Sequence, residues 1–355
     1  MSRLKCQLNV FSRSPHISQI LTGFIMLRNE KVINLEINYK PEMLKLYPTP
    51  HMIEAIIDNR IKVAYDMLDG YNFNKQVVEK YLMGIDFYFK RSYNIAHHKD
   101  FEYASRIYPL GFNYHVTTPK NIIDKRWDIS SIYAAASSLR NNIFFYKRNF
   151  YIEKFEDIPH WDNETLILFL TRAWDPEESS MLDEKIKAER YHINNMRADC
   201  IIKLREIFGG KFIGGFSPSP YTHEKFPSCV VDRALTKRTN FMRLVKKANI
   251  CVATMGLHES NGWKLGEYIA ASKAIVAEKL HYDVPGNFNN IDNYFEFTNA
   301  DQCVQQVMKL YSNKKLAFDM MIKNYNYYHN FLRADRLIFN TITIAIKDAD
   351  CAQLP

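Results

Sequence analysis

Two carboxylates, Glu259 and Glu267, stand with seven residues between them in a stretch that reads ICVATMGLHESNGWKLGEYIAASKAIVAE. Before them, the apolar residues Ile250 to Thr254 predict a buried strand. After the loop, residues from about Gly262 to Lys273 predict a helix, and Ala274 to Ala277 predict a second strand. Strand, loop, helix and strand form the unit of a parallel sheet, in which ligands bind where strands end and helices begin.

The spacing of the two carboxylates suits a phosphorylated ligand with a ribose. A helix N-terminus offers free N–H groups and the positive end of a dipole, so it attracts phosphate. Glu267, one turn inside the helix, can accept hydrogen bonds from ribose hydroxyls, while Glu259 would face the reacting end of the ligand. Two glutamates eight apart also occur on solvated helix faces, and that alternative stays open. The flanking strands, Gly256 and Gly262 favour the binding site.

The segment Glu259-x7-Glu267, followed by Tyr-Ile-Ala-Ala-Ser-Lys-Ala-Ile-Val, resembles the Glu-x7-Glu signature of retaining GT-B glycosyltransferases, which use nucleotide sugars. The sequence departs from the family where Gly-x-Pro is usual, because Ser272 and Ala274 stand there. The resemblance implies an α/β chain with the GT-B fold, that is, two Rossmann-like doubly wound domains facing an interdomain cleft.

The resemblance also implies roles for particular residues. Glu267 would hold the ribose, Glu259 would lie against the donor sugar, and the backbone near His258 would approach the phosphates. The donor nucleotide-sugar site then comprises Arg172, Gly256, Leu257, His258, Lys264, Leu265 and Glu267. Arginine can bind phosphate oxygens in a fork and neutralise the charge on a leaving diphosphate. A second cation would come from Lys264 or Arg190, and neither a metal nor another cofactor is required.

The first half of the chain offers two weaker catalytic candidates. His16 stands in the loop after an opening strand, Leu8 to Phe11, where it would face the cleft; a surface histidine is the alternative. Asp66 ends the predicted strand Ile61 to Tyr65, beside Asp69, which we interpret as a turn residue. A catalytic and a structural role for Asp66 both remain open.

The remaining pattern predicts alternating strands and helices in two domains. Residues 1–159 would form a domain that binds the acceptor, and residues 160–330 a domain that binds the nucleotide sugar. A C-terminal helix and tail, 331–355, could cross back to the first domain. Among the elements of the first domain, residues His51 to Arg60 predict a short helix. In the second, Leu166 to Leu170 predict a buried strand that ends at Arg172. Its glycines lack the Gly-x-Gly-x-x-Gly pattern, which disfavours a dehydrogenase.

Composition narrows the function classes further. At 355 residues with 47% apolar and 14% aromatic residues, the chain is large enough for two folded domains. No apolar stretch reaches the ~20 residues that span a bilayer, so we expect a cytoplasmic protein. The net charge of +8 could serve a phosphorylated ligand and an anionic inner membrane face, or it could be an ordinary basic surface. Nucleic acid is disfavoured because no arginine-rich block or RNA-binding signature occurs.

These observations predict a glycosyltransferase that moves a sugar from a nucleotide-diphosphate sugar to a hydroxyl of a saccharide or lipid-linked acceptor. By analogy, the reaction would serve cell-surface polysaccharide or glycolipid assembly. Two alternatives remain: a sugar-nucleotide epimerase or hydrolase of the same fold, and a non-catalytic module that binds nucleotide sugars or a membrane surface. Six scattered cysteines without a Cys-x2-Cys pair favour reduced, buried thiols.

Overall fold

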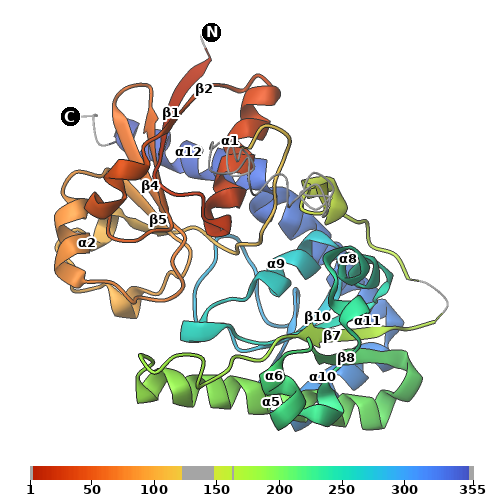
Figure 1. Ribbon diagram of the computed structural model, residues 1–355. Coiled ribbons are helices and arrows are strands. Elements are labelled where there is room, and N and C mark those ends of the chain that lie inside the picture. Colours follow the sequence, from red (N-terminus) through yellow and green to blue (C-terminus); the bar gives the residue numbers. More distant parts are fainter. Residues whose placement is uncertain (1–2, 122–147, 162–163, 352–355) are drawn as a thin grey trace, which may run out of the picture. The chain divides into compact units, whose positions relative to one another are not determined.

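The computed structural model describes residues 3–121, 148–161 and 164–351. The chain divides into two compact units (Figure 1). Unit 1 comprises Met1–Lys154, Tyr282–Gly286 and His329–Pro355, and unit 2 comprises Phe155–His281 and Asn287–Tyr328. Each unit is built around its own sheet and its own hydrophobic core.

Within the described residues, unit 1 has a six-stranded sheet in the order β2-β1-β3-β4-β5-β6. The strands are β1 (Leu4–Val10), β2 (Ile33–Tyr39), β3 (Met52–Ile57), β4 (Ile61–Asp66), β5 (Phe87–Lys90) and β6 (Ile107–Pro109). β3 is antiparallel to both of its neighbours, whereas the other pairs are parallel. The helices include α1 (Ser18–Asn29), α2 (Lys75–Leu82) and α12 (Ala334–Cys351).

The predicted helix from His51 to Arg60 is wrong, because Met52–Ile57 forms strand β3. β3 and β4 make a hairpin in which Ile57 pairs with Ile61. Asp58 and Asn59, in the turn, have φ of 47° and 57°. Asp and Asn tolerate this left-handed backbone better than most residues, so they are typical of hairpin turns. The β-branched isoleucines on either side then favour strands over a helix.

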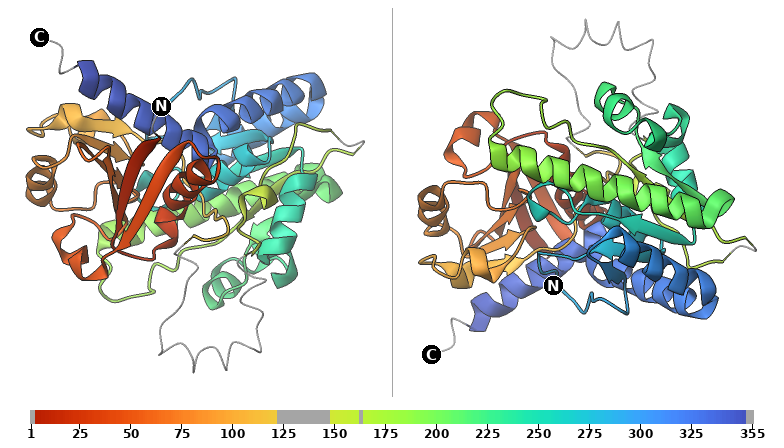
Figure 2. Two further views of the ribbon diagram at one scale, coloured as in Figure 1. Left: turned by 90° about the horizontal axis from the view of Figure 1, so that it is seen from above. Right: turned by 90° about the horizontal axis from the view of Figure 1, so that it is seen from below.

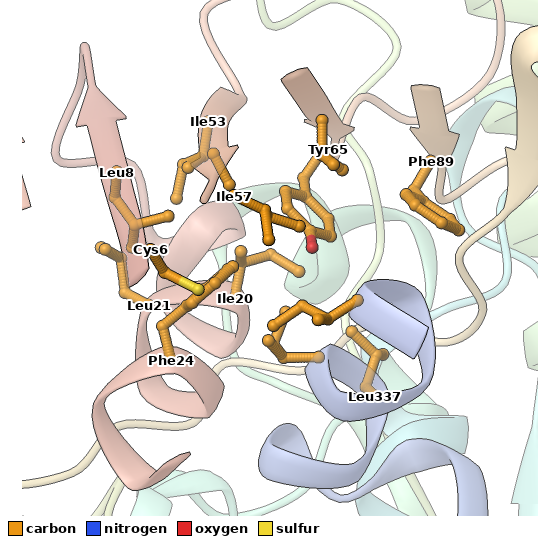
Figure 3. Packing of buried hydrophobic residues seen from close by; sticks show 14 of the residues in the cluster. Cys6, Leu8, Ile20, Leu21, Phe24, Ile53, Ile57, Tyr65, Phe89 and Leu337 are labelled. Carbon is orange, nitrogen blue, oxygen red and sulfur yellow. The ribbon is translucent and has the colours of Figure 1, made fainter. Parts of the chain in front are cut away.

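The core of unit 1 lies between the sheet and helices α1 and α12. In Figure 3, Phe24 and Ile20 of α1 meet Leu8 of β1, Ile57 of β3 and Leu337 of α12. Every residue of α1 from Ser18 to Leu27 is buried, as expected for a helix covered on all sides.

One glycine permits the close approach of α1 and α12. A Cβ atom added to Gly23 would lie 2.1 Å from the carbonyl oxygen of Ala334 and 2.5 Å from Cγ1 of Ile338. Hydrogen bonds on either side hold α12 in place. Gln19 Nε2 of α1 donates to the carbonyl of Leu332, just before α12, and the hydroxyl of Tyr65 in β4 lies 2.9 Å from that of Thr341 in α12. The C-terminal helix is therefore part of the same compact unit as the first strands of the chain.

Within the described residues, unit 2 has a five-stranded sheet, wholly parallel, in the order β11-β10-β9-β7-β8. The strands are β7 (Ile167–Thr171), β8 (Phe212–Phe216), β9 (Ile250–Ala253), β10 (Ala274–Glu278) and β11 (Phe295–Phe297). The helices are α5 (Glu184–Phe208), α6 (Pro220–Lys225), α7 (Arg233–Thr236), α8 (Arg238–Lys247), α9 (Trp263–Ala270), α10 (Ala300–Ser312) and α11 (Lys314–Tyr327).

Both faces of this sheet are covered. Every residue of β7, β9 and β10 is buried, as expected for parallel strands between two layers of helices. On one face, alternate residues such as Phe169 and Val252 share a core cluster with Leu204 of α5 and Val307 of α10. Figure 2 shows α5 as one long, unbroken helix lying over these strands.

The expected α/β class with two Rossmann-like sheets is confirmed, although β3 makes the sheet of unit 1 mixed rather than wholly parallel. The expectation of free, mostly buried cysteines is also confirmed: Cys351 is exposed, and Cys6, Cys200, Cys229, Cys251 and Cys303 are buried. Within the described ranges, none of the helices is both long enough and apolar enough to cross a bilayer.

Candidate functional site

The order of the strands in unit 2 marks one place for a ligand. From β7 the chain moves outward to β8 and then returns to the other side of β7, where β9, β10 and β11 follow. The carboxyl ends of β7 and β9 are thus a topological switch point, the usual ligand position in parallel sheets. Arg172 follows β7 directly, and Gly256, Leu257 and His258 lie in the loop after β9.

Arg197 of α5 joins the two strand ends. Its guanidinium donates to the carbonyl of Arg172 over 2.6 Å, to the carbonyl of Met255 over 2.7 Å and to the hydroxyl of Thr254 over 2.9 Å. Burial lowers the pKa of Arg197 to about 10, with the charge of Glu278 acting in the opposite direction. Arg197 therefore fixes the distance between the two loops that meet at the switch point.

The loop after β9 is held along its length. Glu278 accepts a hydrogen bond from the N–H of Met255 over 2.7 Å, and burial raises its pKa. The N–H of Gly256 donates to the carbonyl of Ser260 over 2.9 Å, and a Cβ on Gly256 would lie 2.5 Å from the Ser260 hydroxyl oxygen. Only glycine fits this tight turn without moving its neighbour.

Glu259, at the end of this loop, is accessible. Its side chain is 56% exposed, and its Oε2 lies 3.7 Å from Nδ1 of His281. Glu259 and His258 have φ of 56° and 60°, in the left-handed region that non-glycine residues seldom adopt. Such strained backbone persists where the surroundings hold it, and it is often found at functional sites.

The first turn of α9 lies next to this loop. Its N-cap residue is Gly262, which has no side chain to accept hydrogen bonds from the first N–H groups of the helix. Leu265, in the first turn, is buried and lines a pocket together with Gly262, Ser260 and Glu278. The helix start predicted from the sequence is therefore in place, with an N-terminus that suits an anion.

Glu267 lies in the interior of the unit. Only 5% of its side chain is exposed, and Arg238 Nη1 donates to its Oε1 over 2.8 Å. The Arg238 guanidinium also lies over the rings of Phe155 and Phe241, at 4.7 and 5.7 Å from their centroids. The ion pair with Arg238 therefore holds the Glu267 side chain in place through one of its two carboxylate oxygens.

Positive charge gathers around α9. Lys264 Nζ lies 3.9 Å from the centroid of the Phe241 ring. Burial lowers the pKa of Lys264 to about 8; Glu267 opposes this shift, and the cations Arg238, Arg197 and Arg172 add to it. The side chain of Arg172 is itself exposed and stacks on Trp174, with its guanidinium carbon 3.7 Å from the ring centroid.

All the donor-site residues predicted from the sequence, and Glu259, lie in unit 2, directly after β7, in the loop after β9 or in α9. Their role in binding a donor stays a prediction. Arg190, the alternative second cation, instead binds Glu178 and the carbonyl of Asp175. Three further residues escaped the sequence analysis: Arg197, Arg238 and Glu189, which binds the His258–Glu259 backbone. Their contacts join positions far apart in the chain, and no local motif marks them.

The candidates in unit 1 lie in a different environment. Asp66 is fully buried and accepts hydrogen bonds from Lys90 Nζ over 2.9 Å, from the Tyr88 hydroxyl over 2.8 Å and from the N–H of Leu68 over 2.9 Å. These contacts account for Asp66 as a structural residue. Asp69 pairs with Arg91. A catalytic role for Asp66 stays a prediction.

His16 stacks on His51, with ring centroids 4.5 Å apart. Burial lowers the pKa of His16 to about 4, with the positive charge of Arg91 and the neighbouring His51 acting in the same direction. The His16 ring is therefore neutral at physiological pH and able to donate one hydrogen bond and accept another. Among the described residues, no group of three His, Cys, Asp or Glu side chains could hold a metal ion.

No family model and no curated protein matches the sequence. The chain is similar in structure to Anabaena HepE in complex with UDP-glucose (TM-score 0.44, 10% identity, 96% of this chain and 100% of that one). It is also similar to S. aureus TarM, a mutant bound to UDP and α-GlcNAc-glycerol (TM-score 0.43, 13% identity, 78% and 49%). The chain thus spans about half the length of TarM.

A third similar structure is a proposed UDP-N-acetylglucosamine 2-epimerase from Listeria monocytogenes (TM-score 0.42, 9% identity, 99% of this chain and 98% of that one). Likenesses as distant as these three do not identify a substrate or a reaction. The function has to be inferred from the residues of the site.

Proposed function

We propose that the chain is a GT-B glycosyltransferase whose unit 2 binds a nucleotide-diphosphate sugar at the carboxyl ends of β7 and β9. The observation that carries the proposal is the gathering of cations at this place. The charges of Arg172, Arg197 and Arg238 all disfavour the protonated form of Lys264. A diphosphate would neutralise this excess positive charge, and the N-terminus of α9 would add N–H donors.

The two carboxylates would bind the two ends of such a ligand. Arg238 engages Oε1 of Glu267, and its second oxygen would accept hydrogen bonds from the ribose hydroxyls. Glu259, which is exposed and follows the strained loop, would bind the sugar to be transferred. The Glu-x7-Glu spacing would place the diphosphate between these ends, at the start of α9.

The cations would also assist the reaction. When the bond between the sugar and the diphosphate breaks, negative charge develops on the leaving phosphate oxygens. Arg172 and Lys264 would stabilise that charge, because fixed cations in a partly buried site are already oriented toward it. The acceptor hydroxyl would be supplied by a saccharide or a lipid-linked saccharide. Transfer with retention of configuration is the outcome that the resemblance to the Glu-x7-Glu family favours.

Isothermal titration calorimetry with UDP, GDP and dTDP tests the proposal. We expect the wild-type chain to bind at least one of them. Glu267→Gln keeps the size of the side chain but removes its charge, and should weaken that binding at least tenfold, which is about 1.4 kcal/mol. Glu206→Gln, on α5 and exposed, is a matched control. No binding by the wild type, or equal binding by Glu267→Gln, would show that the site is wrong.

Incubating the protein with the sugar nucleotide alone distinguishes transfer from epimerisation. A transferase needs an acceptor other than water for efficient turnover, whereas an epimerase converts the sugar nucleotide without one. Rapid epimerisation of the donor alone would replace the transferase proposal with the epimerase alternative.

A further inference from the structure

Glu189, in the second turn of α5, contacts the end of the loop after β9, where Glu259 lies. Its Oε1 accepts hydrogen bonds from the backbone N–H groups of His258, over 2.5 Å, and of Glu259, over 3.4 Å. Its Oε2 lies 3.9 Å from Nδ1 of the His258 ring. One carboxylate on a neighbouring helix therefore binds two successive residues of the loop.

These two residues are the ones with strained backbones. His258 has φ of 60° and ψ of 36°, and Glu259 has φ of 56°. Neither is a glycine, so their left-handed conformation is unfavourable unless outside contacts hold it. The hydrogen bonds from Glu189 are such contacts, because they require both N–H groups to point toward α5 at once.

The helix that carries Glu189 is itself fixed to the site. Arg197, two turns further along α5, binds the carbonyls of Arg172 and Met255. Glu189 is thus carried by the same helix whose Arg197 side chain binds the residues that follow β7 and β9. This fixes the position of Glu189 relative to the loop. A charged carboxylate also forms stronger hydrogen bonds with backbone N–H groups than a neutral side chain would.

The conformation of the loop decides where the Glu259 side chain lies. Glu259 is more than half exposed, and its Oε2 is near the His281 ring. If the two left-handed residues relaxed to ordinary backbone angles, the carboxylate would move away from this position. The Glu189 carboxylate, by holding the loop, therefore determines where the Glu259 carboxylate lies.

We propose that Glu189 is a positioning residue that holds Glu259 in place for the donor sugar. This inference rests on the proposed function, and it adds a residue that touches the loop and not the ligand. Its loss should affect binding of the sugar portion of a sugar nucleotide and leave binding of the nucleoside diphosphate portion unchanged.

Three variants separate this role from a general effect on folding. Glu189→Ala removes both hydrogen bonds and keeps a good helix former. Glu189→Gln keeps an acceptor oxygen without the charge. Glu184→Ala is the control, since Glu184 is on the same helix with a side chain that is 90% exposed and contacts Lys187.

Hydrogen–deuterium exchange of the full chain reports on the loop. In Glu189→Ala we expect the amides of His258 and Glu259 to exchange at least tenfold faster than in the wild type. Glu189→Gln should give an intermediate rate, and Glu184→Ala the wild-type rate. Unchanged exchange in Glu189→Ala would overturn the proposal.

Calorimetry reports on the ligand, with each nucleoside diphosphate compared with a sugar nucleotide that contains it: UDP with UDP-glucose, GDP with GDP-mannose, and dTDP with dTDP-glucose. In Glu189→Ala, the affinity for the nucleoside diphosphate should stay within twofold of the wild type. The wild type should bind the matching sugar nucleotide more tightly than the nucleoside diphosphate, and this difference should be lost in the variant. Equal weakening of both ligands would overturn the positioning role. If the wild type binds none of these ligands, the proposed function is wrong and this inference falls with it. If the wild type binds them and Glu189→Ala matches it, only the inference is wrong.

Discussion

Arg238 and Glu267 form an ion pair in the interior of unit 2, with Nη1 and Oε1 2.8 Å apart and side-chain exposures of 16% and 5%. Glu267, which we propose binds the ribose, is therefore also one partner of a structural ion pair. Removal of one partner of a buried pair leaves the other charge without compensation, and this costs more than the pair itself contributes.

We predict that Arg238→Met lowers the free energy of unfolding by about 3 kcal/mol, because Glu267 is left charged and buried. The double variant Arg238→Met/Glu267→Gln should recover part of that loss, since the unpaired charge is gone. Urea denaturation of the single and double variants measures both effects. Arg243→Met, on the exposed face of α8, should be neutral. A double variant that is no more stable than Arg238→Met would contradict this interpretation.

Binding of a nucleoside diphosphate should weaken as the pH rises above 8. Burial lowers the pKa of Lys264 from its ordinary 10.5 to about 8, with nearby cations acting in the same direction. A bound diphosphate favours the charged lysine, so above pH 8 binding must take up a proton, whereas below pH 8 the proton is already present. Because one proton is taken up on binding, the affinity should decrease by up to about tenfold per pH unit above pH 8.

Calorimetry between pH 7 and pH 9.5 measures this dependence. Lys264→Arg keeps the charge throughout that range and should flatten the profile. A decrease of the same steepness in Lys264→Arg would assign the titration to another group.

Arg197→Met should destabilise unit 2 and loosen the two loops at the switch point. The guanidinium makes three hydrogen bonds, to Arg172, Met255 and Thr254, and hydrogen bonds to charged groups contribute roughly 1.5 to 3 kcal/mol each. Because the methionine still fills the space, we expect a net loss of about 3 kcal/mol. Thermal denaturation compares Arg197→Met with Lys185→Met, which changes an exposed position on the same helix. Equal melting temperatures would show that Arg197 does not tie the strand ends together.

Gly23→Ala should destabilise unit 1 although alanine is the better helix former. Helix propensity alone would give a gain of about 1 kcal/mol. The added methyl group would lie 2.1 Å from the Ala334 carbonyl oxygen, and overpacking of this kind costs typically 1–3 kcal/mol or more. The clash is with backbone, which cannot rotate away, so it should dominate.

Gly84→Ala is the matched control, because the nearest atom to its new methyl group would be 3.8 Å away. Urea denaturation should give a clear loss of stability for Gly23→Ala and little change for Gly84→Ala. An unchanged or higher stability of Gly23→Ala would mean that α1 and α12 can separate at little cost.

Local sequence patterns determined much of unit 2. The apolar runs at β7, β9 and β10 and the glycines around the loop predict the central strand–loop–helix–strand unit, because burial on both faces requires unbroken apolar strands. The spacing of Glu259 and Glu267 likewise placed the candidate site at the start of a helix. In unit 1 the same reasoning failed at β3, where the short, mostly apolar segment Met52–Ile57 suits a helix or a strand. There the Asp58–Asn59 turn decides the outcome through its left-handed backbone.

Periodicity and turn chemistry act over a few neighbouring residues, so most of the elements, and the residue types at their ends, can be predicted from the amino-acid sequence. The partners of those residues depend on how the whole unit folds. Arg238 meets Glu267 across 29 positions of the chain, Glu189 meets Glu259 across 70, and Tyr65 meets Thr341 across 276. Such contacts follow from the order of strands in a sheet and the helices packed on it. The order of the strands depends on how the whole unit buries its apolar residues, and no short stretch of sequence encodes it.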